Sequence, residues 1–408
     1  MSRIAHKPRL AVVSPFLDKR HGTERRVVEW VSRLADMFEI HVYSQRVQDL
    51  DLAKVVWHRI PKFPGPHILN FLWWFVANRV IRLWNARFRG LRPDLIFSPG
   101  PNCLDADVIS VHIVFAEYAG KNNLAEDGSS APDTGWLRRL HRNLYYRLAM
   151  ILEKRAYTSP DIQLILIARK TSLALEKYYG RRGPFPVLYL GLDHQVFNPQ
   201  RRAAIRRDAR KQLDLDDNQF ALLLIGNDWG NKGISVLVEA LALVRELPIH
   251  LLVAGQDDPG AYRPLVRARS MEDRVHFLPP RGDVEVYYAA ADAYAGPSVE
   301  DTFAQPPAEA MACGLPVIVS AANGASEIMT PGEDGLILEN HRDAPALAEM
   351  IRRLYSDGEY RSRLGQAAAR TAEQYTWERN GRELARILEE ILSRKAHRAS
   401  DALAHESR

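Results

Sequence analysis

The sequence predicts an α/β protein made of two domains, each built around a parallel β-sheet. Short apolar segments alternate with helical patterns over nearly the whole chain, which is typical of parallel sheets joined by crossover helices. The chain has 408 residues, which is long for a single hydrophobic core. A hydrophobic content of 46% and a charged content of 26% are those of a soluble globular protein.

The predicted strands fall into two sets along the chain. In the first half they are 10–14, 40–43, 55–59, 95–98, 108–112, 164–167 and 187–189. In the second half they are 221–225, 249–254, 275–277, 293–295, 317–319 and 336–338. The polar, arginine-rich stretch 191–217 separates the two sets, and we interpret it as the connection between the domains.

These patterns predict an N-terminal domain over residues 1–190 and a C-terminal domain over residues 191–376. The segment 377–395 has the periodicity of an amphipathic helix, and we expect it to pack back on the N-terminal domain. The remaining residues, 396–408, form a polar tail that we predict to be disordered.

Charge and cysteine content exclude several classes of protein. Cys103 and Cys313 lie far apart and form no metal-ligand pattern, which favours a reducing, cytoplasmic compartment. Charges follow the short apolar run 10–16 at once, so we expect no signal peptide. No segment reaches the ~20 apolar residues of a membrane span. A net charge of +5 does not by itself indicate nucleic-acid binding, and we expect none.

The most informative segment is 296–335, which contains two acids, Asp301 and Glu309, with seven residues between them. A carboxylate accepts two hydrogen bonds at once, so it suits the paired hydroxyls of a sugar or ribose. The small-residue helix beginning near Gln305 offers amides and a positive dipole end to a diphosphate. The ordered string therefore predicts a nucleotide-sugar site, and the alternative is a surface turn capped by acids.

Other polar segments follow predicted strands in the way that a ligand site requires. His112 ends one strand, and residues 226–228, 255–257 and 296–298 follow three others. Ligands of open α/β sheets bind beyond the carboxyl ends of the strands. We therefore expect these residues to line one edge of each sheet.

The segment 296–335 is similar to the donor-binding signature of the retaining glycosyltransferases of family four, which have the GT-B fold. That family usually has Glu-Gly-Phe-Gly, four variable residues, Glu-Ala-Met-Ala and then Gly-x-Pro-Val. This chain has Asp301, Phe303 and Ala304 in the first block, followed by Glu309-Ala-Met-Ala and Gly314-Leu-Pro-Val. The resemblance covers about residues 8–392. It implies two Rossmann-like domains facing a central cleft.

The resemblance also implies roles for the residues of this segment. Glu309 would hold the ribose hydroxyls of the donor. Asp301, with the backbone amides of Phe303 and Ala304, would orient the sugar, and the helix start after Gln305 would face the diphosphate. The first acid is Asp rather than Glu, and Ala304 stands where glycine is common; Glu300 is an alternative to Asp301.

The strand–loop–helix at 223–241 resembles the family's diphosphate-binding segment. Lys232 matches the family's lysine, whereas Asn227 occupies the position where the family commonly has arginine. Lysine suits a phosphate as a point charge. Either Lys232 and the helix start compensate the diphosphate charge alone, or Arg169 supplies a second cation.

Two residues of the N-terminal half complete the predicted site. Gly22 matches the family's glycine-rich turn, although His21 replaces its first glycine, and the amides near Gly22 would face the donor phosphates. The family has a histidine at the place of His112, which implies a positioning role near sugar and acceptor; the alternative is a structural histidine. We expect the acceptor to be contacted by the variable loop 117–136.

Two further segments, 67–93 and 137–157, mix aromatic and basic residues on amphipathic helical patterns. Such helices suit an anionic membrane surface, and the alternative is a buried helix with a solvated basic face. Membrane contact would place the protein on the inner face of the cell membrane, beside a lipid-linked acceptor.

We therefore predict a cytoplasmic, metal-independent glycosyltransferase that moves a sugar from a UDP- or GDP-linked donor to a hydroxyl of a glycan or lipid-linked acceptor. The anomeric configuration would be retained, and no cofactor is expected. The resemblance implies a role in cell-surface polysaccharide, lipopolysaccharide or glycolipid biosynthesis. The alternatives are a nucleotide-sugar epimerase and a non-catalytic nucleotide-sugar-binding protein on the same fold.

Overall fold

The computed structural model describes residues 7–19, 22–124 and 136–406 of the chain. The chain divides into two compact units. The N-terminal unit comprises Met1–Glu117, Leu137–Gly191 and Trp377–Arg408, and the C-terminal unit comprises Tyr118–Trp136 and Leu192–Thr376. The candidate acceptor loop 117–136 includes residues 125–135, which lie outside the described residues.

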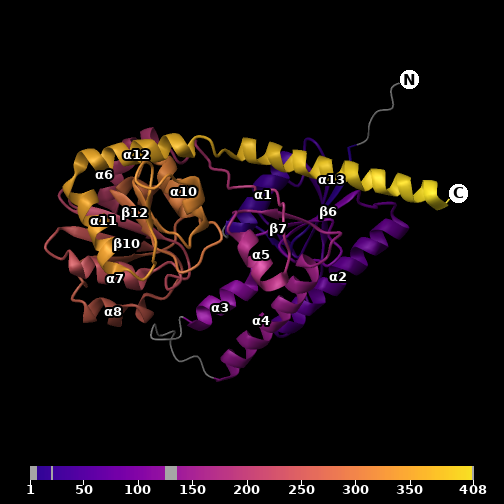
Figure 1. Cartoon of the computed structure of the whole chain (residues 1–408), viewed down its shortest axis with the longest axis horizontal. Helices are drawn as coiled ribbons and strands as arrows, with labels where there is room; N and C mark the ends of the chain where they lie inside the picture. Colours follow the sequence, from indigo (N-terminus) through magenta and orange to yellow (C-terminus); the bar gives the residue numbers. More distant parts are fainter. Residues whose placement is uncertain (1–6, 20–21, 125–135, 407–408) are drawn as a thin grey trace. The chain divides into compact units, whose positions relative to one another are not determined.

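The N-terminal unit is built on a six-stranded parallel sheet with the strand order β5-β3-β1-β6-β7-β8 (Figure 1). The strands are β1 (Arg9–Val13), β3 (Glu39–Ser44), β5 (Val55–Arg59), β6 (Leu95–Pro99), β7 (Val108–Val111) and β8 (Gln163–Leu166). A two-stranded ladder is formed by β2 (Phe16–Leu17) and β4 (Arg46–Val47). Its helices are α1 (Gly22–Leu34), α2 (His67–Phe88), α4 (Trp136–Tyr157) and α5 (Thr171–Tyr179). Helix α3 (Phe115–Leu124) begins in this unit, and its residues from Tyr118 onward belong to the C-terminal unit.

The C-terminal unit repeats this topology with the order β11-β10-β9-β12-β13-β14, again all parallel. Its strands are β9 (Phe220–Ile225), β10 (Ile249–Ala254), β11 (Val275–Leu278), β12 (Ala293–Gly296), β13 (Val317–Ser320) and β14 (Leu336–Leu338). Its α-helices are α6 (Pro199–Gln212), α7 (Ile234–Leu243), α8 (Arg263–Ala268), α9 (Glu285–Ala290), α10 (Gln305–Ala312), α11 (Ala344–Ser356) and α12 (Gly358–Ala372). Two short 3₁₀ helices are η1 (Pro259–Ala261) and η2 (Gly324–Ile328). Counted along the chain within each unit, both sheets have the doubly wound order 3-2-1-4-5-6, so the predicted Rossmann-like class is confirmed.

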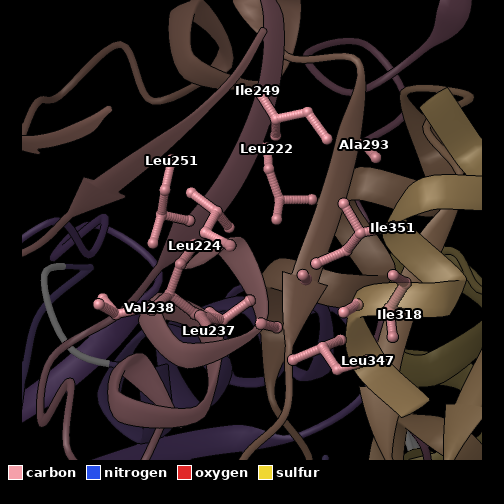
Figure 2. Packing of buried hydrophobic residues seen from close by; sticks show 14 of the residues in the cluster. Leu222, Leu224, Leu237, Val238, Ile249, Leu251, Ala293, Ile318, Leu347 and Ile351 are labelled. Carbon is pink, nitrogen blue, oxygen red and sulfur yellow. The ribbon is translucent and has the colours of Figure 1, made fainter. Parts of the chain in front are cut away.

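Apolar side chains hold the C-terminal sheet to its helices (Figure 2). Leu222 and Leu224 of β9 are fully buried, as are Leu237 of α7 and Leu347 and Ile351 of α11. These helices pack on one face of the sheet, and the apolar strands are buried on both faces, as parallel strands require. The rigid sheet fixes the positions of the loops that leave its carboxyl edge.

The predicted strand at 187–189 is wrong. In the described structure Val187 makes a single isolated bridge with Leu166 of β8. Pro184 and Pro186 precede it, and proline has no N–H to donate to a ladder. The segment is therefore an extended edge contact rather than a seventh strand.

The stretch 191–217, interpreted as the connection between the domains, contains helix α6 (Pro199–Gln212) of the C-terminal unit. Asn198 caps the helix by accepting a hydrogen bond from the Arg201 amide at 2.7 Å. Arg206 donates to the Ala291 carbonyl at 2.7 Å and to Asp292 at 2.6 Å, at the end of α9. These arginines are numerous because they bind the carbonyls that end α9, where cations are stabilising.

The final helix, α13 (Trp377–Glu406), belongs to the N-terminal unit and packs on α1. Asn380 of α13 accepts a hydrogen bond from the Trp30 indole and donates to the Tyr189 carbonyl. Lys395 forms an ion pair with Asp107 at 2.7 Å. The backbone stays helical through residue 406, so the tail predicted to be disordered is helical there; its alanines favour that conformation.

One buried carboxyl of the N-terminal unit predicts a pH-dependent stability. Glu153 of α4 is fully buried, accepts a hydrogen bond from the Phe115 amide at 2.9 Å and accepts another from the Tyr179 hydroxyl. Burial raises the pKa of Glu153 from 4.5 to about 7. The folded protein therefore binds more protons than the unfolded chain between these values, and its stability falls as pH rises through that window.

We expect the stability of Glu153→Gln relative to wild type to be greater at about pH 8 than at about pH 5, by up to about 3 kcal/mol. The reason is that the amide of the variant cannot ionise. The measurement is the difference in free energy of unfolding between variant and wild type at the two pH values. A difference that does not change with pH would contradict the assignment.

Candidate functional site

The carboxyl edge of the C-terminal sheet contains the residues that the sequence predicted for donor binding. β9 lies between β10 and β12, so the chain winds in opposite directions on its two sides. The chain direction across the sheet therefore changes between β9 and β12, and the loops that follow these two strands diverge there. Open α/β sheets bind ligands at such a topological switch point.

Lys232 and Asp301 meet at this switch point. The Lys232 ammonium, from the loop after β9, forms an ion pair with the Asp301 carboxylate, from the loop after β12. Both side chains are about 15% exposed. Gly226 lies against the lysine, where a Cβ would stand 3.0 Å from Lys232 Cε. The structure thus brings together two predicted site residues, and it is Asp301 rather than Glu300 that pairs with the lysine.

Asn231 fastens the same two loops and was missed by sequence reasoning. Its side-chain nitrogen donates to the Glu300 carbonyl at 2.7 Å, and its oxygen accepts from the Glu300 amide at 3.2 Å. Its backbone carbonyl accepts from the Val299 amide at 2.7 Å. The only available signal was its place directly before Lys232. Asn231 therefore fixes the distance between lysine and aspartate.

Gly233 allows the loops to approach this closely. Its φ of +87° lies in the left-handed region, and a Cβ there would stand 2.3 Å from the Pro297 carbonyl oxygen. A side chain is excluded by both conformation and space. The glycine after Lys232 is thus a requirement of the two-loop arrangement.

The carboxylate of Glu309 is oriented by a buried residue of the same unit. Glu309 is 4% exposed, and its Oε2 accepts a hydrogen bond from the Tyr288 hydroxyl of α9 at 2.8 Å. Burial raises the pKa of Tyr288, and the Glu309 carboxylate raises it further, so the phenol remains a donor. The ring of Phe197, from the stretch interpreted as the connection between the domains, packs edge-on against the ring of Tyr288, with 5.6 Å between the ring centres.

Tyr294 of β12 lies near both acids. Burial raises the pKa of this phenol, and the nearby carboxylates of Asp301 and Glu309 raise it further. Both acids therefore lie near one buried ring of β12. The seven-residue spacing of the motif brings them to the same part of the carboxyl edge.

The start of α10 offers fewer amides than the sequence pattern indicated. The second and third residues of the helix are Pro306 and Pro307, which have no N–H. Asn323, also missed by sequence reasoning, is buried and accepts from the Ala304 amide at 3.5 Å and the Ala325 amide at 3.0 Å. The backbone N–H groups that remain to bind an anion at this helix start are therefore those around Gln305.

Asn227 supports the loop after β9. Its side-chain oxygen accepts a hydrogen bond from the Gln256 amide at 3.0 Å. Asp257, from the same β10 loop, accepts from the Asp228 amide at 2.9 Å and the Trp229 amide at 2.6 Å. In this structure Asn227 braces its loop against the next one, and Asp257 is a further residue that sequence reasoning missed.

The other predicted residues belong to the N-terminal unit. Gly22 is the first residue of α1, and Arg169 lies in the turn after β8. His112 follows β7, with Nε2 2.9 Å from Ser110 Oγ and its ring 5.8 Å from that of Trp30. Its Nδ1 is buried and makes no hydrogen bond within the described residues. Burial, followed by the charge of Arg26, holds the pKa of His112 well below its usual range, so the ring is neutral at neutral pH.

Comparison with known proteins gives a family match for the C-terminal unit. Residues 205–371, which include Lys232, Asp301 and Glu309, match the family "Glycosyl transferases group 1". This match covers most of the C-terminal unit. The prediction of the family from the 296–335 segment is confirmed for this part of the chain.

Several relatives carry the name D-inositol 3-phosphate glycosyltransferase. The protein from Salinispora tropica is 31% identical over 52% of this chain and 47% of its own length. The protein from Arthrobacter sp. strain FB24 is 33% identical over 46% of each chain. The match thus spans about half the length of these relatives.

Solved structures of glycosyltransferases share the fold over nearly the whole chain. WaaG, a glycosyltransferase involved in lipopolysaccharide biosynthesis, has a TM-score of 0.76 at 21% identity, covering 93% of this chain and 99% of WaaG. HepE from Anabaena, in complex with UDP-glucose, has a TM-score of 0.69 at 20% identity, covering 94% of this chain and 99% of HepE. The predicted GT-B class is confirmed.

Proposed function

We propose that this glycosyltransferase moves a sugar from a UDP- or GDP-linked donor to a hydroxyl of a glycan or lipid-linked acceptor, with retention of the anomeric configuration. The observation that carries the proposal is the Lys232–Asp301 ion pair beside Glu309 at the switch point of the C-terminal sheet. The complex of HepE with UDP-glucose supports a nucleotide-sugar as donor for this fold.

In the proposed reaction Lys232 serves the leaving group. On donor binding its ammonium exchanges the Asp301 carboxylate for the diphosphate, and it stabilises the negative charge that develops there. The bond between the anomeric carbon and the diphosphate oxygen breaks, and the acceptor oxygen bonds to that carbon on the same face. The acceptor proton passes to the departing diphosphate, so no covalent enzyme nucleophile is needed.

The two acids serve recognition in this proposal. Asp301, released from Lys232, accepts hydrogen bonds from sugar hydroxyls, with the Phe303 and Ala304 segment beside it. Glu309 has one carboxylate oxygen held by Tyr288, which orients the group for the ribose diol. His112 positions the sugar or the acceptor, because a neutral imidazole both donates and accepts.

We further propose that transfer needs neither a metal nor another cofactor, because Lys232 provides the cation beside the diphosphate. The place of action is the cytoplasmic side of the cell membrane, in the synthesis of a cell-surface polysaccharide, lipopolysaccharide or glycolipid. Involvement of WaaG in lipopolysaccharide biosynthesis supports this assignment by analogy of fold.

The direct test supplies labelled UDP- and GDP-sugars with lipid-linked and free glycan acceptors, with and without EDTA. We expect a glycoside whose anomeric coupling in NMR matches that of the donor, formed at the same rate in EDTA. An inverted product would contradict retention, and loss of the rate in EDTA would contradict metal independence. Conversion of the donor sugar without any acceptor would favour an epimerase, and binding without turnover would favour a non-catalytic protein.

A further inference from the structure

Helix α2 of the N-terminal unit has its polar side facing inward. Its buried residues are Trp74, Ala77, Asn78, Arg82 and Asn85, of which three are polar. Arg82 pairs with Asp105 at 2.6 Å, Asn78 donates to the Trp74 carbonyl at 2.6 Å, and Asn85 lies 3.1 Å from His58 Nδ1. The interior thus provides hydrogen-bond partners for all three polar side chains, although Arg82 Nε has none within the described residues.

The outward side of α2 is apolar. Its exposed large apolar residues are Leu69, Leu72, Trp73, Val76, Val80, Leu83, Trp84 and Phe88. With Leu140, Leu144 and Ile151 of α4, these make eleven of the seventeen exposed large apolar side chains in the described part of the chain. A concentration of this kind marks an interaction surface rather than scattered surface residues.

The exposed residues form a continuous stripe along the helix. Val76, Val80 and Leu83 follow one another at helical spacings of four and three, and each is 57% exposed. An ordinary surface helix turns such a stripe toward the core. In α2 the stripe points to the outside, so burial of this surface must come from a partner.

Basic residues flank the stripe. Arg79 and Arg87 are exposed on α2, and the guanidinium of Arg89 lies 4.6 Å from the centre of the Trp84 ring. The sequence has no Asp or Glu between Lys54 and Pro93. The partner surface must therefore be apolar at its centre and negatively charged around it.

Helix α4 adds a similar face. The rings of His67 and Phe71 of α2 each lie 5.2 Å, between ring centres, from the ring of Tyr145 of α4, so the first turns of α2 pack against the middle of α4 (Figure 1). Arg147, Lys154 and Arg155 are exposed on α4. The one acid of α4 is the buried Glu153.

We infer that the outward face of α2, with the adjoining exposed face of α4, docks on a lipid bilayer that contains anionic lipids. The apolar stripe enters the boundary between headgroups and acyl chains while the arginines contact lipid phosphates. None of the helices in the described ranges is long and apolar enough to cross a bilayer, so the helices lie on the surface. This inference rests on the proposed function in one respect: a lipid-linked acceptor gives the protein a reason to bind a membrane.

A second copy of the chain fits this face less well. Two α2 helices meeting across a two-fold axis would bring like-charged arginines together, with no acid in the segment to pair with them. An anionic bilayer satisfies the stripe and the arginines at once.

The test measures co-sedimentation of the full chain with phosphatidylcholine vesicles, with and without phosphatidylglycerol. We expect binding to the anionic vesicles that weakens with salt. The triple variant Val76→Ser, Val80→Ser, Leu83→Ser should bind at least about tenfold more weakly, and so should Arg79→Gln with Arg87→Gln, because each basic residue contributes about fivefold. The matched control is Leu52→Ser, Leu173→Ser, Leu243→Ser, which alters three exposed leucines elsewhere and should bind like wild type.

Circular dichroism and nucleotide binding should be unchanged in both α2 variants, because the altered residues are exposed and lie outside the donor site. Loss of vesicle binding with intact nucleotide binding supports the docking surface, whether or not transfer to a given acceptor is found. Equal vesicle binding by wild type and the triple variant would overturn the inference. A wild-type dimer in sedimentation equilibrium that the triple variant abolishes, without vesicle binding, would instead assign the face to self-association.

Discussion

Replacing Lys232 with methionine is expected to lower the rate of sugar transfer by about 10²–10³-fold. Methionine keeps most of the length of the side chain and removes its charge. The lysine is the cation that the structure places at the switch point of the C-terminal sheet, and Asn227 stands where the family commonly has arginine. The charge of the departing diphosphate would then lose its main compensation from this unit.

The measurement is the initial rate at saturating donor, with Lys211→Met as a matched control because Lys211 is exposed on α6 of the same unit. Asp301→Asn distinguishes the partners of the ion pair. It should strengthen binding of the nucleoside diphosphate, because Lys232 is no longer neutralised, yet lower the transfer rate, because the sugar loses an acceptor. Unchanged rates for both Lys232→Met and Asp301→Asn would remove the ion pair from the mechanism.

Replacing Glu309 with alanine is expected to abolish stabilisation of the protein by nucleotide. A ligand at about 100 times its dissociation constant raises the free energy of unfolding by roughly 2.7 kcal/mol, if it binds only the folded state. We expect either UDP or GDP to do so with wild type. The alanine variant lacks the carboxylate that accepts hydrogen bonds from the ribose hydroxyls. The measurement is thermal unfolding with UDP, GDP and ADP.

The controls separate binding from folding. Glu309→Ala leaves the buried Tyr288 hydroxyl without its acceptor, which itself costs about 1–3 kcal/mol. Tyr288→Phe removes the same hydrogen bond and keeps the carboxylate, so it should be less stable than wild type but still be stabilised by nucleotide. Stabilisation of Glu309→Ala to the same extent as wild type would show that the nucleotide binds elsewhere.

The repeating elements of the fold could be predicted from local patterns. Twelve of the thirteen predicted strands are present in the two sheets, because parallel strands buried on both faces appear as short apolar runs. The run at 187–189 failed because its flanking prolines cannot join a ladder. The arginine-rich stretch 191–217 was interpreted as the connection between the domains, and only the tertiary structure shows that Arg206 binds the end of α9.

The sequence named most residues of the candidate site, but it did not predict which of them are in contact. The order of acids, glycines and lysine carried the family resemblance, and the family is confirmed. That Lys232 pairs with Asp301, 69 residues away in the chain, depends on β9 and β12 being neighbours. Asn231 carried no signal beyond its place before Lys232, and Asn323 carried none, because asparagine is common in loops. Each acts in part through hydrogen bonds to the backbone of a distant segment.

By itself the sequence determined the α/β class, the family and the candidate site residues, because periodicity and motif order are properties of the chain. Only the tertiary structure decided which side of α2 faces inward. Asn78, Arg82 and Asn85 can be buried because each has a hydrogen-bond partner in Asp105, in His58 or in the backbone of their own helix. Two of these partners come from other segments of the chain, so the exposed apolar stripe could not be predicted from the helix alone.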